Sequence, residues 1–127
     1  MNHPSNDQVQ VQVRSEYLAD ESTPSEKEYV FRYSVTIHNQ STIGLKLISR
    51  YWKVTDNQNQ LQEIQGQGVM GQQPKIAANQ DYQYDSLVMI ETPIGIMEGS
   101  FTLIDEHHNY SLAEIKPFIL AEPTQLH

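Results

Sequence analysis

The sequence predicts an all-β protein, built as an antiparallel two-sheet sandwich of about seven strands. Runs of alternating apolar and polar residues recur along the 127-residue chain at hairpin spacing. No segment carries the apolar period of an amphipathic helix. Clusters of Gly, Pro, Asn and Ser separate the runs, as is typical of turns. The length fits one domain over residues 1–127, of which residues 1–7 are expected to be flexible.

The expected strands cover about residues 8–17, 29–38, 45–54, 61–65, 82–89, 97–104 and 110–120. The second is the clearest, because large apolar side chains at the odd positions from 29 to 37 alternate with polar ones. A one-residue slip would expose side chains whose burial is worth on the order of 10 kcal/mol, so its register is fixed. Pro117 interrupts the last strand and predicts an edge position or a bulge there.

The third strand has apolar residues on both faces. We expect Ile48, Trp52 and Val54 to form its core face, and the opposite choice places Leu47 and Tyr51 inside. On the first choice Arg50 shares the face of Trp52, so its guanidinium needs an acidic partner near the sheet edge. If that face is open instead, an arginine beside an aromatic residue is a typical anchor for a partner protein.

The segment from Gly66 to Gly71 matches the spacing of a dinucleotide-binding fingerprint, but Pro74 and a strand pattern follow it in place of a helix. One hypothesis is a concave anion site, in which the amides of Gly66, Gly68 and Gly71 and the charge of Lys75 hold a pyrophosphate group. The favoured interpretation is structural: the glycines permit positive φ and close packing of a sheet edge.

Charge and composition exclude several classes of function. The chain carries 16 acidic against 8 basic residues, which disfavours nucleic acids and anionic membranes as partners. It has no cysteine, so disulfides, thiolate metal sites and a cysteine nucleophile are excluded, and the composition fits a reducing cytoplasm. No apolar run is long enough to span a bilayer. The acidic cluster over residues 16–28 is interpreted as a solvated rim.

No metal ligand, cofactor site or catalytic residue is predicted. Of the five histidines only His107 and His108 are adjacent, and neighbours on an extended chain point to opposite faces. The segment 105–109 is therefore interpreted as a solvated turn. Ser49 and Ser86 lack the context of a nucleophile elbow.

A tryptophan on the third strand and the absence of a cysteine pair favour a fibronectin type III-like sandwich over an immunoglobulin domain. A small closed barrel is the structural alternative.

Several segments carry a resemblance to a known family. They are residues 49–52, 65–74 and 91–93, then Gly95, Met97 and Gly99, with residues 29–37 before them and 118–127 after them. In order and spacing they resemble the bacterial ApaG family, over about residues 8–127. The chain departs from the family pattern at Ala78-Asn79 and at Leu87, which affects only local backbone shape.

The resemblance implies a fibronectin type III-like sandwich without established enzymatic activity. Similar domains occur in F-box and DNA-polymerase-associated proteins, which suggests a protein-interaction module, and the family is linked to cobalt and magnesium tolerance. We therefore predict a non-enzymatic domain that binds an unidentified protein partner or itself. The alternative is nucleotide or pyrophosphate binding at the glycine loop. The candidate binding residues are Arg50, Trp52, Gly66, Gly68, Gly71 and Lys75.

Overall fold

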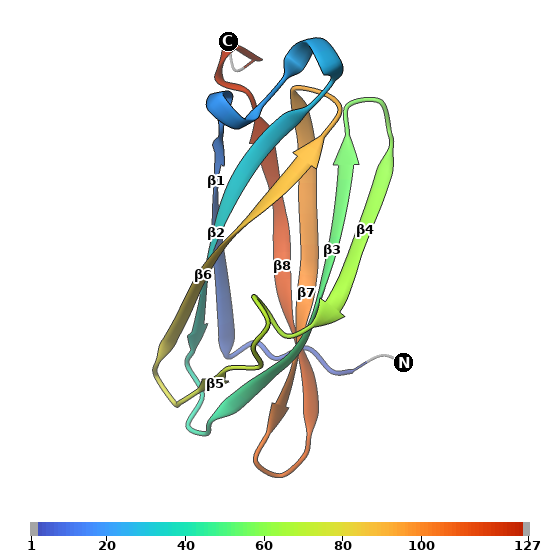
Figure 1. Ribbon diagram of the computed structural model, residues 1–127. Coiled ribbons are helices and arrows are strands. Elements are labelled where there is room, and N and C mark those ends of the chain that lie inside the picture. The colour runs from blue at the N-terminus through green and yellow to red at the C-terminus, as the bar shows by residue number, and fades with distance from the viewer. Residues whose placement is uncertain (1–2, 126–127) are drawn as a thin grey trace.

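The computed structural model describes residues 3–125 and consists of two antiparallel sheets packed face to face (Figure 1). The strands are β1 (Val9–Tyr17), β2 (Tyr29–Asn39), β3 (Leu45–Asp56), β4 (Leu61–Gln67), β5 (Lys75–Ile76), β6 (Asp81–Ile90), β7 (Ile94–Asp105) and β8 (Tyr110–Ala121). One sheet has the order β1-β2-β6 and the other β4-β3-β7-β8, with β5 pairing the start of β3. The predicted all-β sandwich is confirmed, with the two-residue β5 as the strand that the sequence did not indicate.

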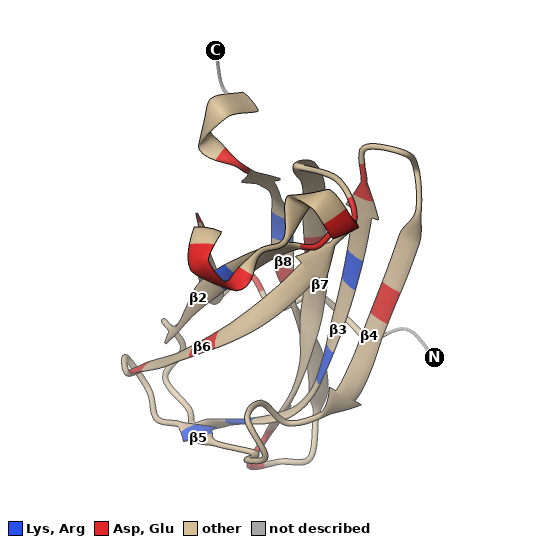
Figure 2. Cartoon of the chain, turned by 45° about the horizontal axis from the view of Figure 1, so that its top comes forward, with Lys and Arg blue, Asp and Glu red and all other residues tan. Residues whose placement is uncertain are grey.

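Three short 3-10 turns are the only helical elements of the described residues: η1 (Ala19–Glu21), η2 (Pro24–Glu26) and η3 (Pro123–Gln125). Figure 2 shows acidic residues on the short turns at one end of the molecule. Asp20, Glu21 and Glu26 are exposed there, as expected for a solvated rim. None of the helices in the described part of the chain has the length and apolarity that crossing a membrane requires.

The core lies between the sheets and follows the alternation of the strands. In β2 the side chains of Phe31, Val35 and Ile37 are almost completely buried, while Arg32 faces solvent. Trp52 of β3 has no exposed surface, and Phe101 of β7 meets it edge to face. Each fully buried side chain of this size stabilises the fold by about 1.5 to 3 kcal/mol.

A bulge in β3 changes which residues face the core. The register against β7 shifts between Leu47 and Ser49, so Ile48 is an extra residue and the buried set changes from odd to even positions. The prediction was right for Trp52 and Val54 and wrong for Ile48, which is only half-buried. Leu47 is buried before the bulge, whereas Tyr51 points outward and donates its hydroxyl to Glu63 at 2.7 Å.

β8 is an edge strand with a bulge, as Pro117 predicted. Its register against β7 shifts between the pairs Met97–Phe118 and Gly99–Ile115, which leaves Pro117 in the irregular stretch. Ser5 forms a parallel bridge with Leu112 of β8. The expected flexibility of residues 1–7 stays a prediction, and Met1 and Asn2 lie outside the described residues.

Candidate functional site

The glycine segment is a tight turn, and no helix follows it. Val69 and Gln72 exchange backbone hydrogen bonds of 2.8 and 2.9 Å around Met70 and Gly71. The φ angles of those two residues are 49° and 76°, the signature of a type I′ turn. Val69 has no exposed surface, so its side chain anchors the turn in the core.

The remaining two glycines allow close packing. Gly66 is the last but one residue of β4 and lies opposite Arg50, where a Cβ atom would come within 2.7 Å of Arg50 Nη1. Gly68 has a φ of 64°, and a Cβ there would lie 2.1 Å from the Gln72 carbonyl oxygen. The amide of Gly68 donates to Ile48 at 2.7 Å. These contacts agree with the structural interpretation, and they occupy amides that an anion would need.

Arg50 binds the glycine segment instead of an acid. Its Nη1 donates to the carbonyl oxygens of Gly68 at 3.0 Å and Gln67 at 3.3 Å. None of the ion pairs among residues 3–125 includes Arg50. The expected acidic partner was therefore wrong, because the carbonyl groups at the end of β4 satisfy the guanidinium in its place.

Next to Arg50 lies a buried cluster of aromatic side chains. Trp52 Nε1 and Tyr84 Oη are both buried without a protein hydrogen-bond partner. Burial raises the pKa of the Tyr84 hydroxyl well above its usual value, and the neighbouring Tyr33 adds to the effect, while Arg50 opposes it. Burial likewise raises the pKa of Tyr33. Trp52 is therefore a core residue, and no open face presents it beside Arg50.

Lys75 lies apart from these residues. It belongs to β5, where it is exposed and pairs with Lys46 of β3. Both lysines line a groove of about 600 Å³ together with Asp105 at the end of β7 and Glu106 in the turn that follows. The structure thus brings together three of the six predicted residues, Arg50, Gly66 and Gly68, while Trp52 lies on the same strand as Arg50 and is buried in the core. Gly71 lies in the adjoining turn.

The histidines within residues 3–125 do not form a cluster of potential metal ligands. Asp105 accepts backbone hydrogen bonds from His107 at 2.8 Å and Asn109 at 2.9 Å, and these bonds hold its pKa below the usual value, the Asn109 bond most strongly. This confirms the predicted turn over residues 105–109. No group of three or more potential ligands for a metal ion occurs within residues 3–125.

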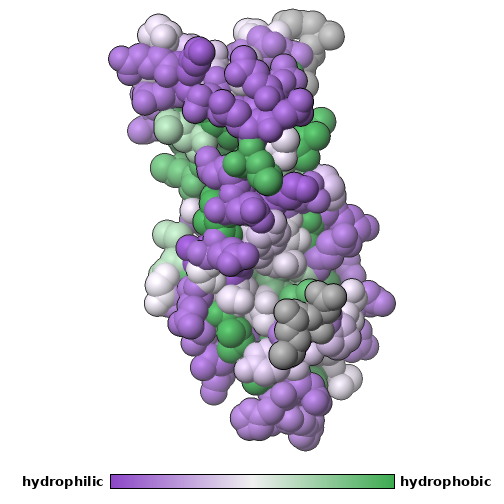
Figure 3. Space-filling view, turned by 90° about the vertical axis from the view of Figure 1, so that its right-hand side faces the viewer, coloured by the Kyte–Doolittle hydropathy of each residue, from purple (hydrophilic) through white to green (hydrophobic). Residues whose placement is uncertain are grey.

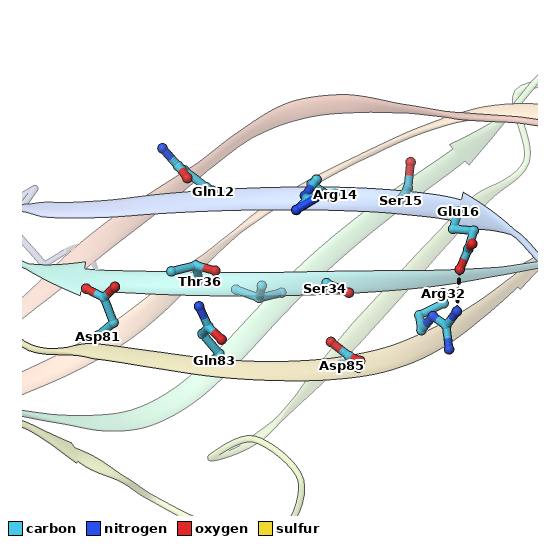
Figure 4. Close-up of a pocket in the computed structure, with 11 residues that line it drawn as sticks. Gln12, Arg14, Ser15, Glu16, Arg32, Ser34, Thr36, Asp81, Gln83 and Asp85 are labelled. Atoms are coloured by element: carbon cyan, nitrogen blue, oxygen red, sulfur yellow. Dashed lines mark hydrogen bonds and ion pairs between the residues drawn. The ribbon is translucent and has the colours of Figure 1, made fainter.

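Sequence reasoning missed a polar hollow on the outer face of the three-stranded sheet (Figure 4). It has a volume of about 960 Å³, and the strand register arranges its lining in rows. One row holds Glu16 beside Arg32, which form an ion pair, and the next holds Arg14, Ser34 and Asp85. A further row holds Gln12, Thr36 and Gln83, and Asp81 closes the lining at that end, where it forms an ion pair with His38 just outside the hollow. No single-strand pattern signals such a hollow, because its lining is assembled from three different strands.

A second surface that the sequence did not reveal is a set of exposed apolar side chains at one end of the sandwich, called here the apolar belt. Leu61, Ile96 and Ile119 lie on the outer face of the larger sheet, and Leu87 and Met89 lie on the outer face of the three-stranded sheet. Leu61, Ile96 and Ile119 lie in one row across the larger sheet, through Thr55. Leu61 and Met89 line the same small pocket between β4 and β6, and Leu87 shares the outer face of β6. In Figure 3 hydrophobic atoms form a band below the polar cap.

The described fold and surfaces define a fibronectin type III-like β-sandwich in which the glycine-rich segment is a structural turn. Residues 19–105 match the family model of the ApaG domain. Protein ApaG of Chromohalobacter salexigens is 42% identical over 120 residues, which cover 94% of each chain. The chain belongs to the ApaG family.

Two solved structures support this assignment. A structural-genomics target determined by X-ray crystallography has a TM-score of 0.91 and 40% identity, and the match covers 96% of this chain and 92% of that one. The crystal structure of a protein described as ApaA, from Bordetella pertussis, has a TM-score of 0.88 and 36% identity, and the match covers 97% and 98% of the two chains. These relatives carry no enzymatic name.

Proposed function

We propose that this protein is a non-enzymatic interaction domain that binds a protein partner through the apolar belt. One observation carries the proposal: five of the seven large hydrophobic side chains that are exposed in the described residues lie in this belt. Their exposed fractions are between 46% and 59%. Single exposed apolar residues are ordinary, whereas larger exposed apolar patches mark binding sites. Leu61, Ile96 and Ile119 form one row on the larger sheet, and Met89 adjoins Leu61 at the pocket between β4 and β6.

The position of the belt supports the same conclusion. Its members come from four strands, β4, β6, β7 and β8, so the exposed set is a product of the fold and not of one hydrophobic segment. Acidic residues border the belt. Glu63 and Glu98 lie on β4 and β7, two positions from Leu61 and Ile96, and Glu91 follows the end of β6. An apolar centre with a charged rim is the usual anatomy of a protein interface.

The experiment places a photo-crosslinking amino acid at position 96 or 119 and, as a control, at Glu114, which is exposed on the same sheet away from the belt. Irradiation in cell extract should give a discrete adduct from the two belt positions only. Ile96→Ser combined with Ile119→Ser should remove adducts made from position 61. Light scattering after gel filtration determines whether the adduct is a second copy of this chain. A strict monomer that gives no adduct from any belt position would count against the proposal.

The nucleotide alternative is not favoured by the geometry, because the amides of Gly68 and Val69 already donate to backbone carbonyls. The link to cobalt and magnesium tolerance stays a prediction. So does the cytoplasmic location.

A further inference from the structure

β6 has an unpaired edge. It pairs only with β2, and Asn39 donates to the Gln80 carbonyl at the start of the ladder. Since hydrogen-bonded pairs alternate in an antiparallel ladder, the backbone groups of even positions in β6 face β2. The backbone N–H and C=O groups of the odd positions point to the free edge. These positions are Gln83, Asp85, Leu87 and Met89. Within the described residues no backbone hydrogen bond outside the β2 ladder involves these four.

The other edges are protected or shorter. β8 has Pro117, a bulge and the bridge to Ser5, and all three hinder pairing with another strand. β1 lies beside β8 at the closed side of the sandwich, where Ser15 Oγ donates to the Ile119 carbonyl at 3.0 Å. β4 has 7 residues, including Gly66, whereas β6 has 10 residues with neither proline, glycine nor lysine. β6 is therefore the edge best suited to strand addition.

The outward side chains of β6 specify what could pair with it. Leu87 and Met89 belong to the apolar belt and are 57% and 47% exposed. Asp85 is exposed and forms no ion pair with any described residue. Directly opposite positions of neighbouring strands contact each other, so an added strand gains most by placing apolar residues beside Leu87 and Met89 and a cation beside Asp85.

We propose that β6 binds an extended segment of a partner protein by antiparallel strand addition, and that this segment has the pattern apolar-x-apolar-x-basic. The inference rests on the proposed function and names the mode and chemistry of the partner. Backbone hydrogen bonds to the free edge supply affinity, and the alternating side chains supply specificity. The formal net charge of −8 favours a basic segment over an acidic one, and over a second copy of this chain.

The probe is the synthetic peptide Thr-Val-Thr-Leu-Thr-Lys-Thr-Gln, compared with a scrambled peptide of the same composition. The alternating peptide should bind and should slow amide exchange at Gln83, Asp85 and Leu87. Even positions, already bonded to β2, should change little. The scrambled peptide keeps the charge but loses the alternation, and it should bind at least about tenfold more weakly.

Two proline variants form a matched pair. Gln83→Pro removes an amide that faces the free edge and leaves the ladder to β2 intact, so peptide binding should be lost. Gln65→Pro is the matching control on β4. The hydrogen bond from the Gly68 amide to the Ile48 carbonyl shows that even positions of β4 face β3, so the amide of Gln65 also points to a free edge. Its loss should leave peptide binding unchanged. Leu87→Lys, on an exposed side chain, provides a second variant that retains the fold and should also abolish binding.

Strand addition is overturned if the alternating peptide does not bind, if it binds Gln83→Pro as well as the natural sequence, or if the odd amides gain no protection. A dimer of this chain that is lost in Gln83→Pro would also overturn it, since the occupant would then be a second copy. Crosslinks from position 119 separate the two proposals. If crosslinks from position 119 persist but the peptide does not bind, only the strand-addition proposal is contradicted. If the crosslinks are absent as well, the proposed interaction domain is also contradicted.

Discussion

Among single residues, the two glycines of positive φ in the turn after β4 have different reasons for being glycine. Gly71 has open space around the position of a Cβ, so an alanine there meets only the backbone cost of about 1 kcal/mol. At Gly68 a Cβ would collide with the Gln72 carbonyl oxygen, which is part of the turn's own hydrogen bonding. Steric demand and not ligand access therefore explains this glycine.

We accordingly expect Gly68→Ala to destabilise the protein by about 3 kcal/mol or more, and Gly71→Ala by about 1 kcal/mol. Urea unfolding followed by tryptophan fluorescence measures both, with Trp52 as the only tryptophan. Equal losses for the two variants would show that the collision at Gly68 relaxes easily, contrary to this explanation.

Tyr84 makes stability depend on alkaline pH. Because burial raises its pKa, the folded protein keeps the hydroxyl proton at a pH where the unfolded chain releases it. The contribution of Tyr84 to the free energy of unfolding is fully present below about pH 10, the pKa of a tyrosine in the unfolded chain. Above that pH it falls by at most about 1.4 kcal/mol per pH unit, the limit for one group.

Tyr84→Phe should flatten this alkaline decline, because it removes the hydroxyl group that burial keeps protonated in the folded protein. Thermal unfolding at several pH values between about 8 and 11 measures the difference from the natural sequence. Tyr110→Phe, on an exposed ring, is the control and should leave the pH profile as it is. Identical profiles for all three proteins would contradict the assignment.

Among the elements, β5 depends on one buried amide. The Asn39 side chain, which has no exposed surface, donates from Nδ2 to the carbonyls of Ile43 and Ile76 at 2.9 Å and Ala77 at 3.3 Å. Its Oδ1 accepts from the amide and hydroxyl of Ser41. A residue at the end of β2 thus ties the turn into β3 to the segment that contains β5.

Asn39→Asp should therefore destabilise the protein by about 3 kcal/mol or more, because a carboxylate would face carbonyl oxygens and lose the donors. Ser41→Ala removes only one partner and should cost about 1 kcal/mol. Chemical denaturation gives both values, and amide exchange at Ile76 shows whether β5 is released. A tolerated Asn39→Asp would mean that the segment rearranges around the new charge.

The elements also show which structural features the sequence predicts. Strict alternation of apolar and polar residues was sufficient to predict β2, whose odd positions from 31 to 39 are buried, and Pro117 was sufficient to predict the irregularity of β8. The bulge at Ile48 carries no such marker, because an isoleucine fits either face of a strand. Because of this bulge, Leu47 at an odd position and Trp52 at an even position are both buried. A constant period of two residues could not predict this. The partner of Arg50 was missed for a related reason: backbone carbonyls as acceptors leave no trace in the sequence.

For the whole molecule, both candidate surfaces depend on pairing between distant strands. Leu61, Ile96 and Ile119 are unremarkable in their own strands and become a row only through the registers β4-β3-β7-β8. The hollow likewise combines residues of three strands. A single sequence contains the alternation but not the register, so it predicted the sandwich and could not predict either surface.

Substitutions in the belt should separate stability from binding. Ile96→Ser together with Ile119→Ser should lower the free energy of unfolding by only about 1 kcal/mol or less per site, because both side chains are about half exposed and lose mainly their contact with each other across the strands. Denaturation curves measure this, and the crosslinks described above measure binding. A large loss of stability would show that the belt packs against part of the fold instead of serving a partner.

The charge of the whole molecule and the geometry of the turn lead to the same expectation for nucleotides. A net charge of −8 opposes a polyphosphate anion, and the amide of Gly68, which a phosphate would have to recruit, already donates to Ile48. Titration with ATP and dinucleoside polyphosphates at physiological salt should therefore leave the amide resonances of Gly66, Gly68 and Gly71 in place at millimolar ligand. Lys75→Ala is the control for any weak effect of charge alone. A saturable shift at Gly68 that survives in Lys75→Ala would mean that the turn opens to accept an anion, and the glycines would then serve a ligand as well as the fold.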